Sequence, residues 1–221
     1  FNMSEEEWDS VIEVHLKGAF NLISAMSKRF RKTKSGGRII CMSSDSAYGA
    51  AAQPNYAAAK AGILGLTWSC AEALKRYGAT ANAVIPNGAT RMIDAKPESK
   101  QVFERTGKWP SELAVGTEKD PDNVAPLVTY LASDSADYIN GQVFFSQGYS
   151  YSRISQPSID CAIRKSAPWT VEELVKVFPK TLGDGLKPPF ASSMLDFIRD
   201  VPAELWTTSD PGQSAWRKTG A

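Results

Sequence analysis

Helical and strand-like segments alternate along most of the chain, and this order restricts the fold more than any other feature. Apolar residues recur at helical spacing between Trp8 and Phe30, which predicts a first helix. Ser4 and Glu7 precede that run with the S-x-x-E spacing of a capping box. Two further helices are expected at about residues 55–77 and 120–132.

Three short apolar runs separate or follow these helices and predict buried strands at residues 38–43, 80–86 and 142–146. The alternation predicts an α/β fold in which helices cover both faces of a parallel sheet. Three strands make a thin sheet with one unprotected edge, so further strands either belong to this fold or are missing from this chain. Because the chain opens at Phe1 without an initiator methionine, we expect a fragment or a processed chain.

Composition excludes several functional classes. Lys and Arg total 25 against 24 Asp and Glu, so no field of one sign is available to hold a nucleic acid or an anionic membrane. A single histidine and three scattered cysteines exclude zinc fingers, HExxH proteases, CxxC redox chemistry and other metal sites. Unclustered thiols and the lack of a long apolar run predict a protein of a reducing compartment without a membrane span. The cytoplasm is the favoured location and the peroxisome the alternative.

Two regions lack the regular alternation. Residues 93–119 are polar and interrupted by proline and glycine, so we expect an irregular segment that is disordered or functional, for example a substrate lid. Beyond Tyr149 the alternation stops, and only short helices at residues 170–178 and 192–199 are expected. The sequence therefore divides into residues 1–149, with the lid at 93–119, and a C-terminal extension at 150–221 that is helical or irregular.

Tyr56 and Lys60 carry the strongest chemical signal. On a helix, residues four apart share a face, so the phenol and the ammonium are within reach of a common point. A nearby cation favours the phenolate and lowers the pKa of a tyrosine, which can then exchange a proton with an alcohol or a ketone. Taken alone, the YxxxK spacing also fits an ordinary pair on a helix surface.

Polar residues follow two of the expected strands at the edge where α/β sheets bind ligands. Ser44 follows the first strand, and its hydroxyl can align a substrate oxygen with the phenol; Ser43 and Ser46 are rivals for that role. Pro86-Asn87-Gly88-Ala89-Thr90-Arg91-Met92 follows the second strand. Its amides and the Thr90 hydroxyl can bind a polar ring substituent or a phosphate, although the segment also fits a simple turn.

The order of these pieces resembles the short-chain dehydrogenase/reductase family. Within this family, the chain most resembles the (3R)-hydroxyacyl-CoA dehydrogenases. These include the dehydrogenase units of peroxisomal multifunctional enzymes of type 2 and the bacterial relatives of those units. The resemblance covers roughly residues 1–180. The matching stretches are VHLKG at 14–18, Ser44, NYAAAKAG at 55–62, NAVIP at 82–86, PNGATRM at 86–92, NVAPLV at 123–128, AIRK at 162–165 and WTVEE at 169–173.

The resemblance implies the C-terminal part of a doubly wound, Rossmann-like domain, and it implies roles for the residues. Tyr56 would be the general acid/base, Lys60 would lower its pKa and hold the nicotinamide ribose, and Ser44 would orient the carbonyl. Pro86, Asn87, Gly88 and Thr90 would lie against the nicotinamide end of the cofactor. His15 occupies the position of a proton-relaying asparagine of the family, and an imidazole can relay protons near neutral pH. A lone histidine on an apolar helix face also fits an ordinary core residue.

The chain departs from the family's pattern in its phosphate-binding parts. The TGxxxGxG turn and the NNAG stretch are absent, and no GxGxxG occurs in the 221 residues. We expect those elements to precede Phe1, together with the residue that separates NAD from NADP. The cofactor is therefore NAD or NADP, with NAD favoured, and the chain alone is expected to bind it poorly.

The implied activity is an NAD(P)-dependent oxidoreductase that interconverts a secondary alcohol and a ketone on a 3-hydroxyacyl-CoA or a steroid-linked acyl-CoA. One alternative is a 3-oxoacyl-ACP reductase-like ketoreductase, and another is a non-catalytic truncated subunit or fragment. Small residues on the second helix, among them Ala57, Ala61 and Gly65, imply an interface between helices. The expected partners are a second copy in a homodimer or homotetramer, or a related subunit in a heteromer.

Overall fold

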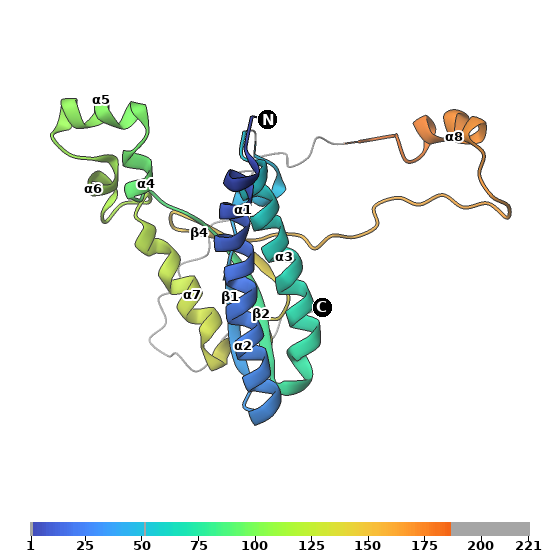
Figure 1. The fold of residues 1–221 in the computed structure, drawn as a ribbon, viewed down its shortest axis with the longest axis horizontal. Coiled ribbons are helices and arrows are strands. Elements are labelled where there is room, and N and C mark those ends of the chain that lie inside the picture. Colours follow the sequence, from blue (N-terminus) through green and yellow to red (C-terminus); the bar gives the residue numbers. More distant parts are fainter. Residues whose placement is uncertain (1, 51, 187–221) are drawn as a thin grey trace, which may run out of the picture. The chain divides into compact units, whose positions relative to one another are not determined.

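The computed structural model describes residues 2–50 and 52–186, so the helix expected at 192–199 lies outside the described residues. The elements appear in Figure 1 in chain order. The helical segments of the amino-terminal half are α1 (Glu5–Ile12), η1 (Glu13–Lys17), α2 (Gly18–Thr33), η2 (Asp45–Tyr48), α3 (Pro54–Leu74) and η3 (Lys75–Tyr77). The later ones are α4 (Arg91–Asp94), α5 (Pro97–Thr106), α6 (Pro110–Ala114), η4 (Pro121–Val124), α7 (Ala125–Ala132), η5 (Asp134–Ala136), α8 (Val171–Val177) and η6 (Phe178–Lys180). The strands are β1 (Gly37–Met42), β2 (Ala79–Asn87), β3 (Val143–Gln147) and β4 (Ser150–Arg153).

The sheet has the strand order β1-β2-β3-β4, and its first three strands are the three predicted from the apolar runs. The pairs β1–β2 and β2–β3 are parallel, as expected. The fourth strand was not predicted. It pairs with β3 in antiparallel fashion after a tight turn at Gly148, which has a positive φ of 56°. A four-residue edge strand with alternating exposure has no apolar run by which it could be found.

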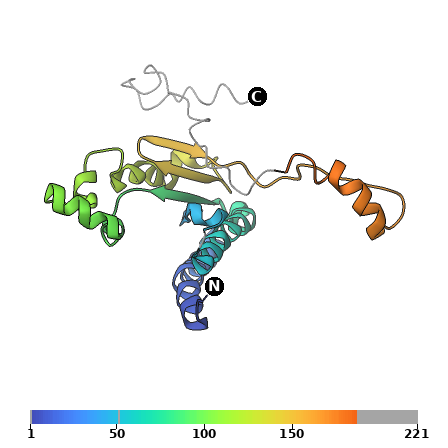
Figure 2. The same ribbon diagram turned by 90° about the horizontal axis from the view of Figure 1, so that it is seen from above.

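Helices cover both faces of the sheet, as the alternation predicted. On one face, Val84 of β2 packs with Leu127 and Leu131 of α7 in a buried cluster. On the other face, α3 lies along β2 and α2 lies over β1, and Figure 2 shows the sheet between these helices and α7. Residues 79–85 of β2 are all buried, because this strand is covered on both faces.

The first helix covers residues 5–33, as expected, but it is less regular than the periodicity predicted. The Ser4 capping box is present and begins α1. The helix then passes through η1, one turn of π-helix at Glu13–Lys17, before it continues as α2. Turns of this kind are rare and occur frequently at functional sites. The insertion rotates the residues of η1 relative to a regular helix, and His15 is one of them.

Residues 93–119 are not irregular, which corrects the sequence prediction. They contain the second half of α4 and all of α5 and α6, which are short helices. Pro97 and Pro110 each occupy the first turn of a helix, where proline is tolerated, so residues taken as breakers are in fact helix starters. The rings of Phe103 and Trp109 stack with centroids 4.6 Å apart and join two of these helices.

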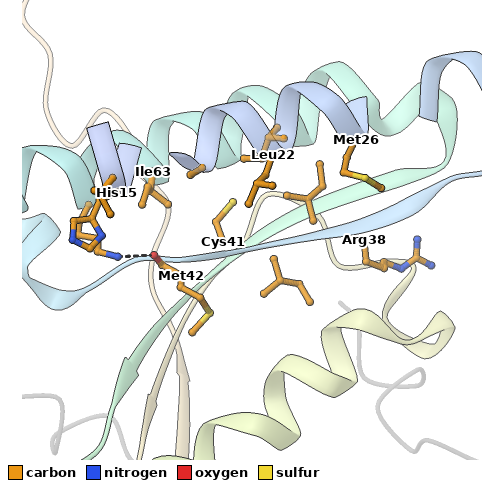
Figure 3. Close-up of a pocket in the computed structure, with 13 residues that line it drawn as sticks. His15, Leu22, Met26, Arg38, Cys41, Met42 and Ile63 are labelled. Carbon is orange, nitrogen blue, oxygen red and sulfur yellow. Dashed lines mark hydrogen bonds between the residues drawn. The ribbon is translucent and has the colours of Figure 1, made fainter. Parts of the chain in front are cut away.

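The outer edge of β1 is open, as the thin sheet predicted. Within residues 2–50 and 52–186, no strand pairs with β1 on the side away from β2. A groove of about 340 Å³ runs along this edge beneath α2. Figure 3 shows Leu22 and Met26 of α2, Cys41 of β1 and Ile63 of α3 around it.

The remaining described residues lie beyond β4. The short helix expected at residues 170–178 is present as α8, which begins with a capping box at Thr170, and Glu173 also forms an ion pair with Lys165. None of the helices in the described part of the chain combines the length and the apolar character that crossing a bilayer requires.

Candidate active site

Helix α3 places Tyr56 and Lys60 on one face, as their spacing predicted. The helix begins at Pro54 and continues through three alanines, residues with the highest helix propensity, so the four-residue spacing becomes one helical turn. The Lys60 Nζ atom lies 5.4 Å from the centre of the Tyr56 ring. A cation at this distance is attracted by the electrons of the ring face.

Lys60 is buried, with 8% of its surface exposed. Its Nζ donates a hydrogen bond to the backbone carbonyl of Met42, at the end of β1, over 3.0 Å. Burial lowers the pKa of the Lys60 ammonium below its ordinary value of 10.5. The hydrogen bond holds the ammonium close to the carboxyl end of the sheet. Within the described residues, no carboxylate forms an ion pair with it.

His15 contacts Tyr56 directly. The two rings meet edge to face, with centroids 5.2 Å apart and an angle of 84° between their planes. Burial lowers the pKa of the His15 imidazole below 6.5, and the charge of Lys60 lowers it further. The neutral imidazole, which has one donor and one acceptor nitrogen, is therefore the favoured form near pH 7.

The structure separates the three candidate serines. Ser43 is 2% exposed, and its hydroxyl donates to the backbone carbonyl of Lys60 over 2.9 Å, so it is part of the packing between β1 and α3. Ser44 is half-buried and caps η2 by accepting a bond from the Ser46 amide. The Ser44 hydroxyl donates to Asp45 over 2.9 Å. Ser44 and Ser46 are both partly exposed at the turn that packs on α3, whereas Ser43 is buried.

The segment from Pro86 to Thr90 lies at the same edge of the sheet. Met42 of β1 is opposite Val84 of β2, so the residues that come after each strand are neighbours. Pro86, Asn87 and Thr90 are exposed. Thr90 caps α4 through the amide of Met92, so part of the segment is the turn that the sequence also allowed.

The residues present fit one end of a nicotinamide dinucleotide. Gly88 packs so closely on Pro121 that an added Cβ would lie 2.8 Å from the Pro121 Cα. The backbone just after β2 therefore has no side chain at this position. The exposed Asn87 and the buried cation of Lys60 are suited to a carboxamide and to ribose hydroxyls. For the phosphates, the 221 residues contain no glycine-rich turn of the GxGxxG type.

The groove beside β1 reaches this cluster without including all of it. His15, Met42 and Lys60 line one end of the groove, which is otherwise largely apolar. Figure 3 shows His15 at the end of the groove where the hydrogen bond to the Met42 carbonyl is drawn. Tyr56 is half-buried and is not among the residues that line the groove.

Comparison with known proteins decides the family. A sequence model described as enoyl-(acyl carrier protein) reductase matches residues 1–150, more than half of the chain. The chain belongs to the short-chain dehydrogenase/reductase family.

Among curated relatives of this short-chain dehydrogenase/reductase chain, hydroxyacyl-CoA dehydrogenase ChsB1 of Mycobacterium tuberculosis is 41% identical over 169 residues, which are 72% of this chain and 50% of the relative. The (3R)-3-hydroxyacyl-CoA dehydrogenase of Canis lupus familiaris is 39% identical over 63% of this chain and 52% of its own length. The 3-oxoacyl-[acyl-carrier-protein] reductase FabG of Staphylococcus aureus is 37% identical over 67% of this chain and 59% of its own. The chain thus spans about half the length of the curated relatives that it matches.

Solved structures agree with this assignment. A short chain dehydrogenase from Mycobacterium avium superposes with a TM-score of 0.68 and 34% identity, covering 86% of this chain and 60% of that one. Full-length peroxisomal multifunctional enzyme type 2 from Drosophila melanogaster superposes with a TM-score of 0.63 and 28% identity, covering 81% of this chain and 30% of that one.

Two polar residues next to the predicted set were missed by the sequence analysis of this short-chain dehydrogenase/reductase chain. Asp45 accepts the Ser44 hydroxyl, and Asn55 bonds both to the amide of Tyr56 and to the backbone of α1. An asparagine in the first turn of a helix is a signal for capping, but its partner on α1 could not be inferred, because that partner is a backbone atom of a distant segment.

Proposed function

We propose that this chain supplies the proton-transferring half of an NAD- or NADP-dependent dehydrogenase that interconverts a secondary alcohol and a ketone. The observation that carries the proposal is the cluster of Tyr56, Lys60 and His15 at the carboxyl edge of a parallel sheet. The relatives named as hydroxyacyl-CoA dehydrogenases favour a 3-hydroxyacyl-CoA or a steroid-linked acyl-CoA as the substrate.

In the oxidation of the alcohol, Tyr56 accepts the hydroxyl proton as the C–H bond of the carbinol carbon breaks. An NAD or NADP held at this edge of the sheet would supply the acceptor for the hydride that leaves this carbon. Lys60 holds its charge 5.4 Å from the centre of the Tyr56 ring, and its ammonium is available to ribose hydroxyls. Ser44 aligns the substrate oxygen by rotating its hydroxyl away from Asp45. His15 passes the proton from the Tyr56 side toward solvent as a neutral imidazole.

We place the substrate lid at residues 93–119. The three helices of this segment are joined by the Phe103–Trp109 stack and by Asp94, which accepts bonds from the amide and the hydroxyl of Ser111. Such a segment can move as one body over a substrate at the end of β2. We also propose that residues 1–149 form the dehydrogenase part and 150–221 an extension, and that NAD is preferred to NADP. The cytoplasm, or alternatively the peroxisome, stays the predicted location.

Assembly is proposed to use the exposed side of α3. Ala61 and Gly65 are exposed there, and a Cβ added to Gly65 would meet nothing within 4 Å. Trp8 and Phe20 on the neighbouring helix are also exposed, at 39% and 53%. Small residues beside exposed aromatic ones let two helix pairs approach closely, as in a four-helix bundle. A homodimer is the simplest form, and a homotetramer or a heteromer with a related subunit extends it.

A second candidate function is reduction of 3-oxoacyl groups on an acyl carrier protein. The observation that favours it is the similarity to the FabG reductase, which this chain matches over a larger share of the relative's length than it does the CoA dehydrogenases. The two candidates differ in the acyl carrier. Comparing kcat/KM for CoA esters, carrier-protein esters and free steroids separates them, and we expect the CoA thioester to be preferred.

The experiment that tests the proposed chemistry is Tyr56→Phe in the full-length protein. Removing the phenol oxygen is expected to lower kcat by about 10²- to 10⁴-fold, because general acid–base catalysis contributes that much. Tyr138→Phe is the matched control, since Tyr138 is 67% exposed and precedes β3, at the amino end of the parallel strands and so at the opposite edge of the sheet from the cluster. Unchanged turnover of a 3-hydroxyacyl-CoA by the Tyr56→Phe variant excludes the mechanism and favours the non-catalytic alternative.

A further inference from the structure

Asn55 uses both ends of its side-chain amide. Its Oδ1 atom accepts a hydrogen bond from the amide of Tyr56 over 2.7 Å, within the first turn of α3. Its Nδ2 atom donates to the backbone carbonyl of Glu7 in α1 over 3.0 Å. Only 8% of Asn55 is exposed, so water offers little replacement for either bond. The Asn55 side chain therefore has one favoured orientation. In that orientation it links α1 to Tyr56, the next residue in the sequence.

The tie has a counterpart on the other side of His15. Gly62 of α3 lies against Leu16, and a Cβ added to Gly62 would come within 2.9 Å of a Leu16 methyl carbon. This close approach fixes the distance between η1 and α3. His15 lies between the two anchor points, about 12 Å along the helix from Glu7 at 1.5 Å per residue and directly before Leu16.

The arrangement explains why the His15 and Tyr56 rings meet. Sequence spacing alone does not bring them together, because they belong to different helices. A helix that is attached at Glu7 and packed at Leu16 has little freedom to rotate or to slide along α3. The π-helical turn then sets the direction of His15 between those points, and the centroid of its ring lies 5.2 Å from that of the Tyr56 ring.

We propose that Asn55 is a positioning residue, which holds His15 against Tyr56 by tying α1 to the start of α3. The inference rests on the proposed function for its catalytic meaning, since His15 and Tyr56 are the proton-transfer pair. The competing explanation is that Asn55 only caps α3. The two explanations differ in which of the two bonds matters: positioning needs the donor to Glu7, and capping needs the acceptor for Tyr56.

One substitution separates the two bonds. Asn55→Asp keeps an oxygen that accepts from the Tyr56 amide, and an acid at a helix start is favourable, but it has no donor for the Glu7 carbonyl. Asn123→Asp is the matched control. Asn123 also donates its Nδ2 to a backbone carbonyl, that of Thr117, at a place remote in sequence from both rings.

The measurement uses the fact that the chain has a single histidine. NMR spectra of histidine-labelled protein therefore report on His15 alone. In the wild-type chain we expect an upfield ring-current shift of its protons and nuclear Overhauser contacts to Tyr56. In Asn55→Asp we expect both to be lost while the backbone amide spectrum remains that of a folded protein. Asn123→Asp should keep both signals.

Asn55→Asp with an unchanged ring-current shift and unchanged contacts overturns the proposal and leaves Asn55 as a cap. If Asn55→Asp does not fold, Asn55→Ser is measured in the same way, because its hydroxyl is too short to reach α1. In the full-length enzyme, the expected kinetic effect is a fall in kcat of about 100-fold with KM little changed, as for a misplacement near 1 Å. The spectra do not depend on activity, so the positioning role and the dehydrogenase function can fail separately.

Discussion

The rings of His15 and Tyr56 meet edge to face, with centroids 5.2 Å apart and their planes at 84°. Lys60 is close to the same phenol, and its charge acts on both rings. Three groups that exchange or hold protons thus come from two helices and share one location. The charge of Lys60 lowers the pKa of His15, so a change at Lys60 is expected to be measurable at the imidazole.

The stability of the chain should fall in mild acid because of His15. Burial and the nearby Lys60 lower the pKa of this imidazole below 6.5. The unfolded chain therefore binds a proton more readily than the folded chain, and stability that is complete above pH 6.5 is lost as the pH falls through the folded pKa. Urea denaturation between pH 5 and 8 (about the titration range of histidine) measures this.

His15→Gln is the comparison for that measurement. It should flatten the dependence of stability on pH in this window, since the chain has no other histidine. The carboxylates whose pKa is lowered, such as Glu13 and Asp120, contribute only at lower pH. Equal slopes for the wild-type chain and the variant would show that the imidazole has an ordinary pKa.

Lys60 should cost stability while it serves catalysis. Burial lowers the pKa of its ammonium below 10.5, so the folded chain holds this proton less tightly than the unfolded chain and folding is less favourable below that pH. Lys60→Met keeps the length and removes the charge. We expect the free energy of unfolding at pH 7 to stay the same or to rise by up to about 2 kcal/mol, and turnover to be lost.

Chemical denaturation and kcat of the full-length protein check this pair of effects. Lys28→Met, at an exposed position of α2, is the control and should change neither. A clear loss of stability in Lys60→Met would mean that the bond from Nζ to the Met42 carbonyl outweighs the cost of burying the charge.

Ser43 and Ser44 should respond in opposite ways to alanine. Ser43 is buried and bonded to the Lys60 carbonyl, so Ser43→Ala should lower the free energy of unfolding by about 1 kcal/mol. Ser44 is partly exposed, and Ser44→Ala should lower kcat by about 100-fold through the loss of a substrate-orienting donor. Each serine is the control for the other. A larger kinetic effect at Ser43 would reassign the substrate-facing hydroxyl.

The sequence was sufficient where the signal is local. The common face of Tyr56 and Lys60 follows from helical spacing alone, and the three parallel strands follow from apolar runs. The edge strand β4 has no apolar run, so its pairing with β3 could not be predicted from the sequence. Pro97 and Pro110 were taken as interruptions because a proline that ends a helix looks the same in the sequence as one that begins a short helix.

The parts of the site that were not predictable depend on tertiary packing. The bond of the Ser43 hydroxyl to the Lys60 carbonyl depends on how β1 meets α3. The contact between His15 and Tyr56 depends on a π-helical turn for which no sequence signal is known. The role of Asn55 was not predicted, because its partner is the backbone carbonyl of Glu7. Every residue has such a carbonyl, so the amino-acid sequence does not indicate which one is bonded.

Gly88 should be required for packing at the end of β2. An added Cβ would lie 2.8 Å from the backbone of Pro121, which cannot move like a flexible side chain. Gly88→Ala should therefore cost about 1–3 kcal/mol of stability. Gly65→Ala is the matched control, because a Cβ there meets nothing within 4 Å and alanine favours a helix; it should stabilise the monomer by about 0.5–1 kcal/mol. Thermal unfolding compares the two, and a tolerated Gly88→Ala would contradict the close approach.

The 221-residue chain alone should bind the cofactor weakly. The residues at the carboxyl edge of the sheet fit the nicotinamide end, but the sequence contains no GxGxxG turn to hold the phosphates on a helix start. We expect a dissociation constant for NADH above about 1 mM, compared with micromolar values that full contact with both halves of a dinucleotide can supply. Fluorescence titration with NADH measures it, and the Tyr56→Phe chain is the control for binding that does not involve the phenol. Stoichiometric binding of NADH at micromolar concentration would show that the dinucleotide phosphates are held by residues other than a glycine-rich turn, and Lys60 and Thr90 would then be the first positions to test by substitution.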